Sequence, residues 1–200
     1  MLSFLALGDS YTLGEQVLLA ESFPYQALQL LRGKGLEITA PEIIATTGWT
    51  TDELSAAIAQ TGFLKSYDLV TLLIGVNNQY RGRSADEFAG EFEALLKQAI
   101  GFTGDQNKNV FVFSIPDWGV TPFADGRDRS TIAKEIDAYN AICKEIASKY
   151  QCTFIDITIS QRGESGNAEM LAADGLHPSG KEYAKWAKRL ADAVILLRFS

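Results

Sequence analysis

Short apolar runs alternate with longer helical segments along almost the whole of this 200-residue chain. The runs are nearly continuous in apolar residues, which is typical of parallel strands that are covered on both faces. Five of them are predicted strands, at residues 2–7, 36–45 (interrupted by Pro41), 69–75, 110–115 and 153–157. Because parallel strands are joined by right-handed helical crossovers, the alternation predicts an α/β protein with a three-layer α/β/α sandwich.

Helical periodicity and capping pairs mark the segments between these runs. One helix is predicted from about residue 25 to 32, and another places apolar side chains at i, i+3 and i+4 between residues 132 and 146. Three more helices are expected to start where a hydroxyl residue precedes a glutamate by three positions: Thr50 and Glu53, Ser84 and Glu87, and Ser179 and Glu182. With no internal repeat and no linker-like tract, residues 1–200 are expected to form a single domain.

Charge and histidine content argue against several classes of protein. The chain has 18 Lys and Arg against 25 Asp and Glu, a formal net charge of −7. Nucleic-acid-binding proteins need a basic surface, so this balance disfavours a nucleic-acid partner. The single histidine, His177, excludes a multi-histidine metal site, and no metal is expected. No apolar run is long enough for membrane insertion and no signal peptide is recognised, so a cytoplasmic location is expected.

Polar residues with catalytic chemistry follow four of the predicted strands. Ser10 comes directly after the first strand in a Gly-Asp-Ser motif, and Gly48 follows the second strand. Asn77 follows the third strand, and Asp174 and His177 stand three residues apart before the last helix. Because binding sites of parallel sheets lie at the carboxyl ends of the strands, these residues are expected to converge.

The converging residues are those that acyl transfer requires. A serine hydroxyl such as that of Ser10 is a weak nucleophile until a base removes its proton. His177 is the side chain that takes a proton near neutral pH and returns it to a leaving group, and Asp174 would hold its imidazole in one tautomer. The backbone amides of Ser10 and Gly48 and the side-chain amide of Asn77 are candidate donors to the oxyanion.

These motifs also carry a family resemblance. They resemble the sequence blocks of the SGNH hydrolases, also called the GDSL esterase/lipase superfamily. The first block falls on residues 7–10 with Ser10 as nucleophile, and the second on Gly48. The third block, Gly-x-Asn, ends at Asn77, and the last block, Asp-x-x-His, falls on Asp174 and His177.

The resemblance implies both a fold and an activity. It implies a flavodoxin-like, five-stranded parallel sheet of order 2-1-3-4-5, and ester hydrolysis through a covalent acyl-enzyme without a cofactor. A small-molecule ester is the expected partner, with small acyl or acetyl esters first, carbohydrate-linked ones included. Two departures stand out. Tyr11 replaces the leucine of the name GDSL, and Asn78 stands where many members have aspartate.

Three further residues are expected to shape the substrate pocket. Trp49 follows Gly48, Asn78 follows Asn77, and Trp118 lies in the segment after the fourth strand. Arginines at 80–83 and 126–129 are expected near the same end of the sheet. Anion recognition is one interpretation of these arginines, and ordinary solvated loop charge is the simpler one.

Several alternatives remain open at this point. Lysophospholipase or thioesterase activity would use the same machinery. An α/β-hydrolase would need a G-x-S-x-G elbow that the chain lacks, and a metallophosphoesterase would need more histidines. A flavodoxin-like binding domain without catalysis is the non-enzymatic alternative. Oligomeric state, acyl-chain length and leaving group are not determined by the sequence.

Overall fold

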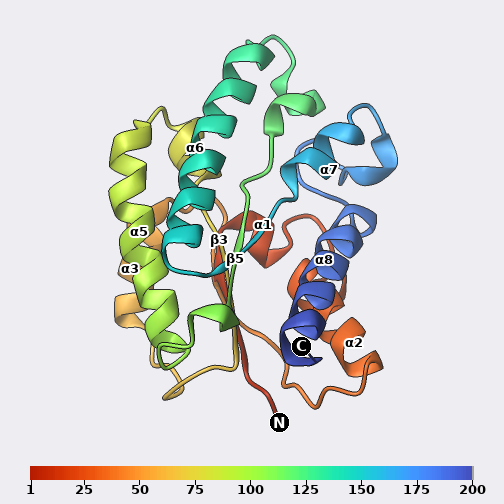
Figure 1. The fold of residues 1–200 in the computed structure, drawn as a ribbon. Coiled ribbons are helices and arrows are strands. Elements are labelled where there is room, and N and C mark those ends of the chain that lie inside the picture. The colour runs from red at the N-terminus through yellow and green to blue at the C-terminus, as the bar shows by residue number, and fades with distance from the viewer. Residues whose placement is uncertain (200) are drawn as a thin grey trace.

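Five parallel strands form one sheet in the order β2-β1-β3-β4-β5, with helices on both faces (Figure 1). This computed structural model describes residues 1–199. The strands are β1 (Phe4–Gly8), β2 (Glu42–Ala45), β3 (Leu69–Leu73), β4 (Val110–Phe113) and β5 (Thr153–Ile155). The predicted α/β/α architecture and strand order are therefore confirmed.

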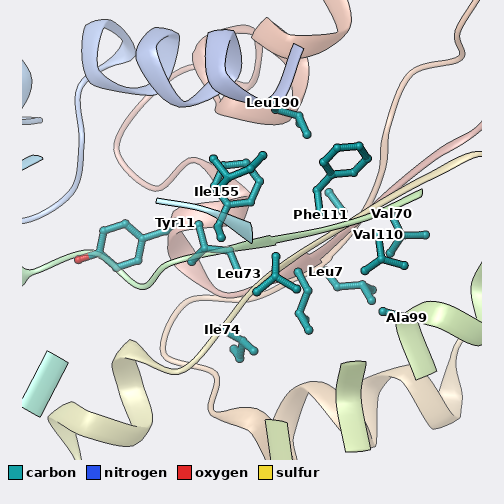
Figure 2. Close-up of a cluster of buried hydrophobic side chains, with 14 of the residues drawn as sticks. Leu7, Tyr11, Val70, Leu73, Ile74, Ala99, Val110, Phe111, Ile155 and Leu190 are labelled. Carbon is teal, nitrogen blue, oxygen red and sulfur yellow. The ribbon is translucent and has the colours of Figure 1, made fainter. Parts of the chain in front are cut away.

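The three central strands form the middle of the core. Every residue of β1, β3 and β4 is buried, as expected for strands with a helix layer on each face. Figure 2 shows Leu190 of the last helix on one side of these strands and Ala99 on the other side. Burial on both faces explains why the runs are continuously apolar.

The helices divide between the two faces. On one face α2 (Phe23–Gly33) packs against α8 (Gly180–Phe199), and on the other α5 (Ala85–Phe102) lies between α3 (Thr51–Gln60) and α6 (Arg129–Lys149) (Figure 1). Two of the three expected caps are present. The Thr50 amide donates to Glu53 at 2.9 Å, and the Glu87 amide donates to Ser84 at 3.1 Å.

The structure differs from the sequence prediction in three places. The predicted strand 36–45 is reduced to Glu42–Ala45, with one separate bridge from Ile38 to Leu2, because Pro41 has no amide hydrogen to continue the ladder. An additional short helix, α7 (Thr158–Gly163), follows β5, where the sequence pattern predicts no helix. The prediction that Ser179 and Glu182 form a capping pair is wrong. The Ser179 hydroxyl donates instead to the Glu169 carbonyl at 2.6 Å, and Glu182 accepts from the Trp186 indole at 2.9 Å.

Two short helices begin at strand ends and determine the site. They are α1 (Ser10–Leu13), which follows β1, and α4 (Val76–Tyr80), which follows β3. Both start at the carboxyl edge of the sheet, so their first residues face the same region. Within residues 1–199, no helix is both long and apolar enough to cross a membrane.

Candidate active site

Gly8 and Asp9 place Ser10 at the first turn of α1. Asp9 caps this helix, and its carboxylate accepts from the Tyr11 amide at 3.0 Å. A Cβ at Gly8 would lie 2.4 Å from the Leu73 carbonyl oxygen and 2.1 Å from the Thr12 hydroxyl. The motif therefore has a glycine because the backbone of β3 passes too close for any side chain.

Ser10, His177 and Asp174 form one chain of hydrogen bonds. The His177 ring lies with Nε2 2.9 Å from the Ser10 hydroxyl and Nδ1 2.6 Å from an Asp174 oxygen. Burial raises the pKa of Asp174, but hydrogen bonds from the His177 ring and from the Leu176 and His177 amides outweigh it, so the pKa lies below its ordinary value. The carboxylate is thus ionised at neutral pH. The imidazole then carries its proton on Nδ1, and its Nε2 accepts the hydrogen bond of the Ser10 hydroxyl.

A tight loop holds Asp174 and His177 in position. The Ala172 amide donates to the His177 carbonyl at 2.8 Å, and Gly175 adopts a left-handed φ of 66°. On the inner side, the Tyr11 ring packs against the His177 ring with centroids 5.0 Å apart. Tyr11 is buried, so the residue that replaces the GDSL leucine supports the imidazole directly. This role of Tyr11 was missed at the sequence level.

Two of the three predicted oxyanion donors, Gly48 and Asn77, lie at or just after a glycine with a left-handed φ. Gly48 has a φ of 85°, and its N–H has no acceptor within the described part of the chain. Gly75, before α4, has a φ of 130°, and a Cβ there would lie 2.7 Å from the Phe88 ring. Asn77 follows, and its Nδ2 donates to the Trp49 carbonyl at 3.0 Å. That bond fixes the amide and uses one of its two N–H groups, which leaves the other for a ligand.

Two of the predicted pocket residues lie elsewhere, and these expectations are corrected. The Asn78 side chain is completely buried. It accepts from the Thr51 amide at 3.1 Å and donates to the Thr51 hydroxyl at 2.6 Å, so it ties α4 to α3. Trp49 is half-buried against the core and offers the site only its carbonyl. Successive side chains of a helix diverge by about 100°, so Asn77 and Asn78 point in different directions.

A cavity of about 170 Å³ lies between the polar groups and an apolar wall. Ser10, Gly48, Asn77 and His177 line one part of it, which brings the predicted catalytic and oxyanion residues together. The wall consists of apolar and aromatic side chains: Val76, Tyr80, Trp118, Phe123 and Leu176. Trp118 lies where the sequence analysis expected it, in the lining. Tyr80 and Phe123 were missed, because Tyr80 ends a five-residue helix and Phe123 lies in a 3₁₀ turn, and both elements are too short to show a periodic pattern.

Burial also acts on the carboxyl group next to Ser10. It raises the pKa of Asp9 to about 7, although amide hydrogen bonds lower it, and one Asp9 oxygen has no hydrogen-bond partner among the described residues. Asp9 therefore caps α1, but its burial makes the ionised form of its carboxyl group less stable. Nowhere in residues 1–199 do three or more His, Cys, Asp or Glu side chains group as metal ligands.

Comparisons with known proteins identify a family and similar folds. The model of the GDSL-like Lipase/Acylhydrolase family matches residues 6–185. A lipase/acylhydrolase from Enterococcus faecalis superposes with a TM-score of 0.77 at 20% identity, over 97% of this chain and 95% of that one. No curated protein sequence matches the chain.

Two esterase structures are similar in fold. The acetylxylan esterase Axe2 from Geobacillus stearothermophilus has a TM-score of 0.72 at 19% identity, over 98% of this chain and 93% of that one. The psychrotrophic esterase EstA from Pseudoalteromonas sp., in a structure inhibited by monoethylphosphonate, has a TM-score of 0.71 at 14% identity over 100% of both chains. At these identities the likeness concerns the fold.

Proposed function

This chain belongs to the GDSL-like lipase/acylhydrolase family of ester-hydrolysing enzymes, and we propose that it cleaves short acyl esters through a covalent intermediate on Ser10. The observation that carries the proposal is the hydrogen-bonded chain from Ser10 through His177 to Asp174, at 2.9 Å and 2.6 Å, on the edge of an apolar cavity. Nucleophile, base and orienting carboxylate are in hydrogen-bond reach of one another, as nucleophilic catalysis requires.

In the first half of the reaction the Ser10 oxygen attacks the acyl carbon while His177 Nε2 takes the hydroxyl proton. Asp174 stabilises the imidazolium, and His177 then donates the proton to the departing alkoxide. In the second half His177 removes a proton from water, which attacks the acyl-enzyme. The carboxylic acid leaves and Ser10 regains its proton.

Three N–H groups are positioned for the negative charge that develops on the acyl oxygen. They are the Ser10 amide in the first turn of α1, the unpaired Gly48 amide and the free N–H of the Asn77 side chain. Amides in the first turn of a helix have no intrahelical acceptor, so the Ser10 amide costs the fold nothing when it turns to a ligand. Removal of one such donor typically costs about 10²–10³ in kcat.

The cavity supports a short acyl group. Its volume of about 170 Å³ is close to the ~150 Å³ of an engineered protein cavity that binds benzene, so about six carbon atoms fill it. Acetyl and butyryl esters fit within that limit, and longer acyl chains would extend into solvent. The likeness to an acetylxylan esterase supports acetylated carbohydrates as candidate substrates. Thioester hydrolysis uses the same groups and is the second candidate.

Active-site labelling tests the nucleophile. The folded protein is incubated with a fluorophosphonate probe and digested, and the modified peptide is located by mass spectrometry. Modification of Ser10, absent in Ser10→Ala, is the expected result. Failure to label Ser10 in folded protein would count decisively against the mechanism.

A substrate panel then tests the acyl specificity. Acetyl, butyryl and octanoyl esters, an acetylated xylooligosaccharide and an acetyl thioester are compared by kcat/KM. Acetyl and butyryl esters are expected to exceed the octanoyl ester. Faster hydrolysis of the octanoyl ester would contradict the limit that the cavity volume sets.

A further inference from the structure

Three aromatic rings close the apolar wall of the cavity. Trp118 lies 5.3 Å from Tyr80 and 6.0 Å from Phe123, and Tyr80 lies 6.2 Å from Phe123, all between ring centroids. Trp118 is 4% exposed, whereas Tyr80 and Phe123 are 44% and 41% exposed. The three rings thus form a triangle in which Trp118 is buried and Tyr80 and Phe123 face solvent.

A buried hydrogen bond holds the buried ring of this triangle. The Trp118 indole donates to the Gln79 side-chain oxygen at 2.7 Å, and the Gln79 amide donates to Glu135 at 2.7 Å. Gln79 belongs to α4, the helix that carries Asn77. The rings are therefore fixed relative to the proposed oxyanion donors.

The guanidinium of Arg127 lies over all three rings. Its central carbon is 5.2 Å, 5.3 Å and 5.6 Å from the centroids of Tyr80, Trp118 and Phe123. One of its nitrogens donates to the Tyr80 hydroxyl at 3.2 Å. The nearly equal distances place the cation above the triangle, where the negative faces of the rings attract it.

Arg127 differs from the other arginines in the two segments that the sequence analysis singled out. Those pair with carboxylates at ordinary ion-pair distances: Arg81 with Glu53 at 3.2 Å, Arg83 with Asp52 at 2.7 Å, and Arg129 with Asp125 at 2.6 Å. Arg127 has no carboxylate within ion-pair distance in residues 1–199, and the adjacent Asp128 caps α6 instead. In a chain of net charge −7, this exposed cation packs on three rings that line the cavity and has no anion as a partner within residues 1–199.

We propose that Arg127 binds a negatively charged group of the substrate, so that the enzyme prefers esters carrying a carboxylate over uncharged esters of the same shape. The proposal rests on the proposed function. It assigns the substrate class: a short acyl ester with an anionic group, borne by the acyl chain or by the alcohol, that extends past the aromatic wall to Arg127.

The chemistry of the guanidinium supports this assignment. It has five N–H donors in a planar fork that matches a carboxylate, and within residues 1–199 only one of them is used, in the bond to Tyr80. Aromatic rings hold the cation in place without neutralising it, so the remaining donors stay available. The overall negative charge of the protein would otherwise repel an anionic ester, and Arg127 supplies the local positive charge that offsets this repulsion.

The test compares each anionic ester with its amide isostere. Monoethyl glutarate and ethyl glutaramate carry the variable group on the acyl side, and 3-acetoxypropanoate and 3-acetoxypropanamide carry it on the alcohol side. The kcat/KM of each is measured by pH-stat for the wild type, Arg127→Gln and Arg127→Lys. Arg189→Gln on α8 is the matched control, because it removes the same charge from an exposed arginine that, within residues 1–199, packs on none of the rings that line the cavity.

We expect the anion-to-amide ratio to fall at least about fivefold in Arg127→Gln for one of the two pairs, and less in Arg127→Lys. The pair that responds identifies which part of the substrate carries the charge. The ratio should stay unchanged in Arg189→Gln, and the wild-type ratio should fall toward the Arg127→Gln value at about 1 M salt, where charges are screened within ~3 Å.

The two proposals fail in different ways. If the wild type hydrolyses neither the uncharged esters that carry an amide group nor simple acetyl esters, the proposed function is wrong. If it hydrolyses them and both ratios are the same in Arg127→Gln, only the assignment of Arg127 is overturned. A far-UV circular dichroism spectrum and a urea-unfolding midpoint equal to those of the wild type show that Arg127→Gln is folded.

Discussion

The two sides of the cavity are built in different ways. On the polar side, helix caps and tight turns fix Ser10, Asp174 and His177, and His177 is only 7% exposed. On the aromatic side, Tyr80 ends α4, and Trp118 and Phe123 lie in the 3₁₀ turns η3 (Trp118–Val120) and η4 (Pro122–Ala124). Ring contacts, the bond from Trp118 to Gln79 and the Asp117 cap of η3 hold that side together.

This difference separates the reaction from the choice of substrate. Backbone hydrogen bonds constrain the polar side, and few sequences can replace them without moving the reacting atoms. The aromatic side needs only apolar surface of a suitable shape. Substitutions on the polar side should therefore change kcat, and those on the aromatic side should change KM and the order of substrates.

The largest effect is expected for Ser10→Ala and His177→Ala. Each should lower kcat/KM for an acetyl ester by at least about 10³, and the double variant should lose little more, because the two residues act as a unit. Steady-state kinetics of the three variants measures this. Losses that multiply in the double variant would show that the two residues act independently.

Asn77→Ala is expected to lower kcat by about 10²–10³ with little change in KM, because the amide is proposed to stabilise only the oxyanion. Asn78→Ala is the matched variant. It should leave the buried Thr51 amide without its acceptor and lower the free energy of unfolding by about 1–3 kcal/mol, with a much smaller effect on kcat. Kinetics and urea unfolding of both variants distinguish the roles, and equal losses of kcat would refute this division.

Gln79→Leu tests the aromatic side. It removes the acceptor of the buried Trp118 indole, so the free energy of unfolding should fall by about 1–3 kcal/mol. The KM for a butyryl ester should rise several-fold relative to an acetyl ester, while kcat for the acetyl ester stays within about threefold. If acetyl and butyryl esters lose kcat equally, Gln79 supports the catalytic side instead.

Asp9→Asn should have the smallest effect on activity and a distinct effect on stability. The pKa of Asp9 is about 7 in the folded protein, against an ordinary value of 3.8, because of burial. Between about pH 4 and 7, the Asp9 carboxyl group therefore keeps its proton in the folded state and loses it in the unfolded state. Its contribution to stability is therefore complete below about pH 4 and is lost as the pH rises through about 7.

Urea unfolding of the wild type and Asp9→Asn across this pH range measures the difference. The stability of the wild type relative to the variant should decline from about pH 4 to 7 and then level off. A parallel pH dependence in the two proteins would show that Asp9 is ionised in the folded state.

The sequence by itself determined the layers of the fold and the polar side of the cavity. Continuous apolar runs encode buried strands, and the catalytic candidates lie within a few residues of strand ends or of each other, where local geometry decides their position. Asp174 and His177 share one turn, and Ser10 begins the helix after β1. The sequence predicts the positions of these residues because they depend on contacts between residues close together in the chain.

Only the tertiary structure decided which side chains form the wall. Asn78 turned inward and Trp49 stayed outside the cavity, while Tyr80, Phe123 and Arg127 met from segments up to 47 residues apart. No periodic pattern predicts which way the side chains of such turns point, and packing between distant segments selects among their orientations. The sequence therefore specified the reacting groups, and packing specified what they are able to meet.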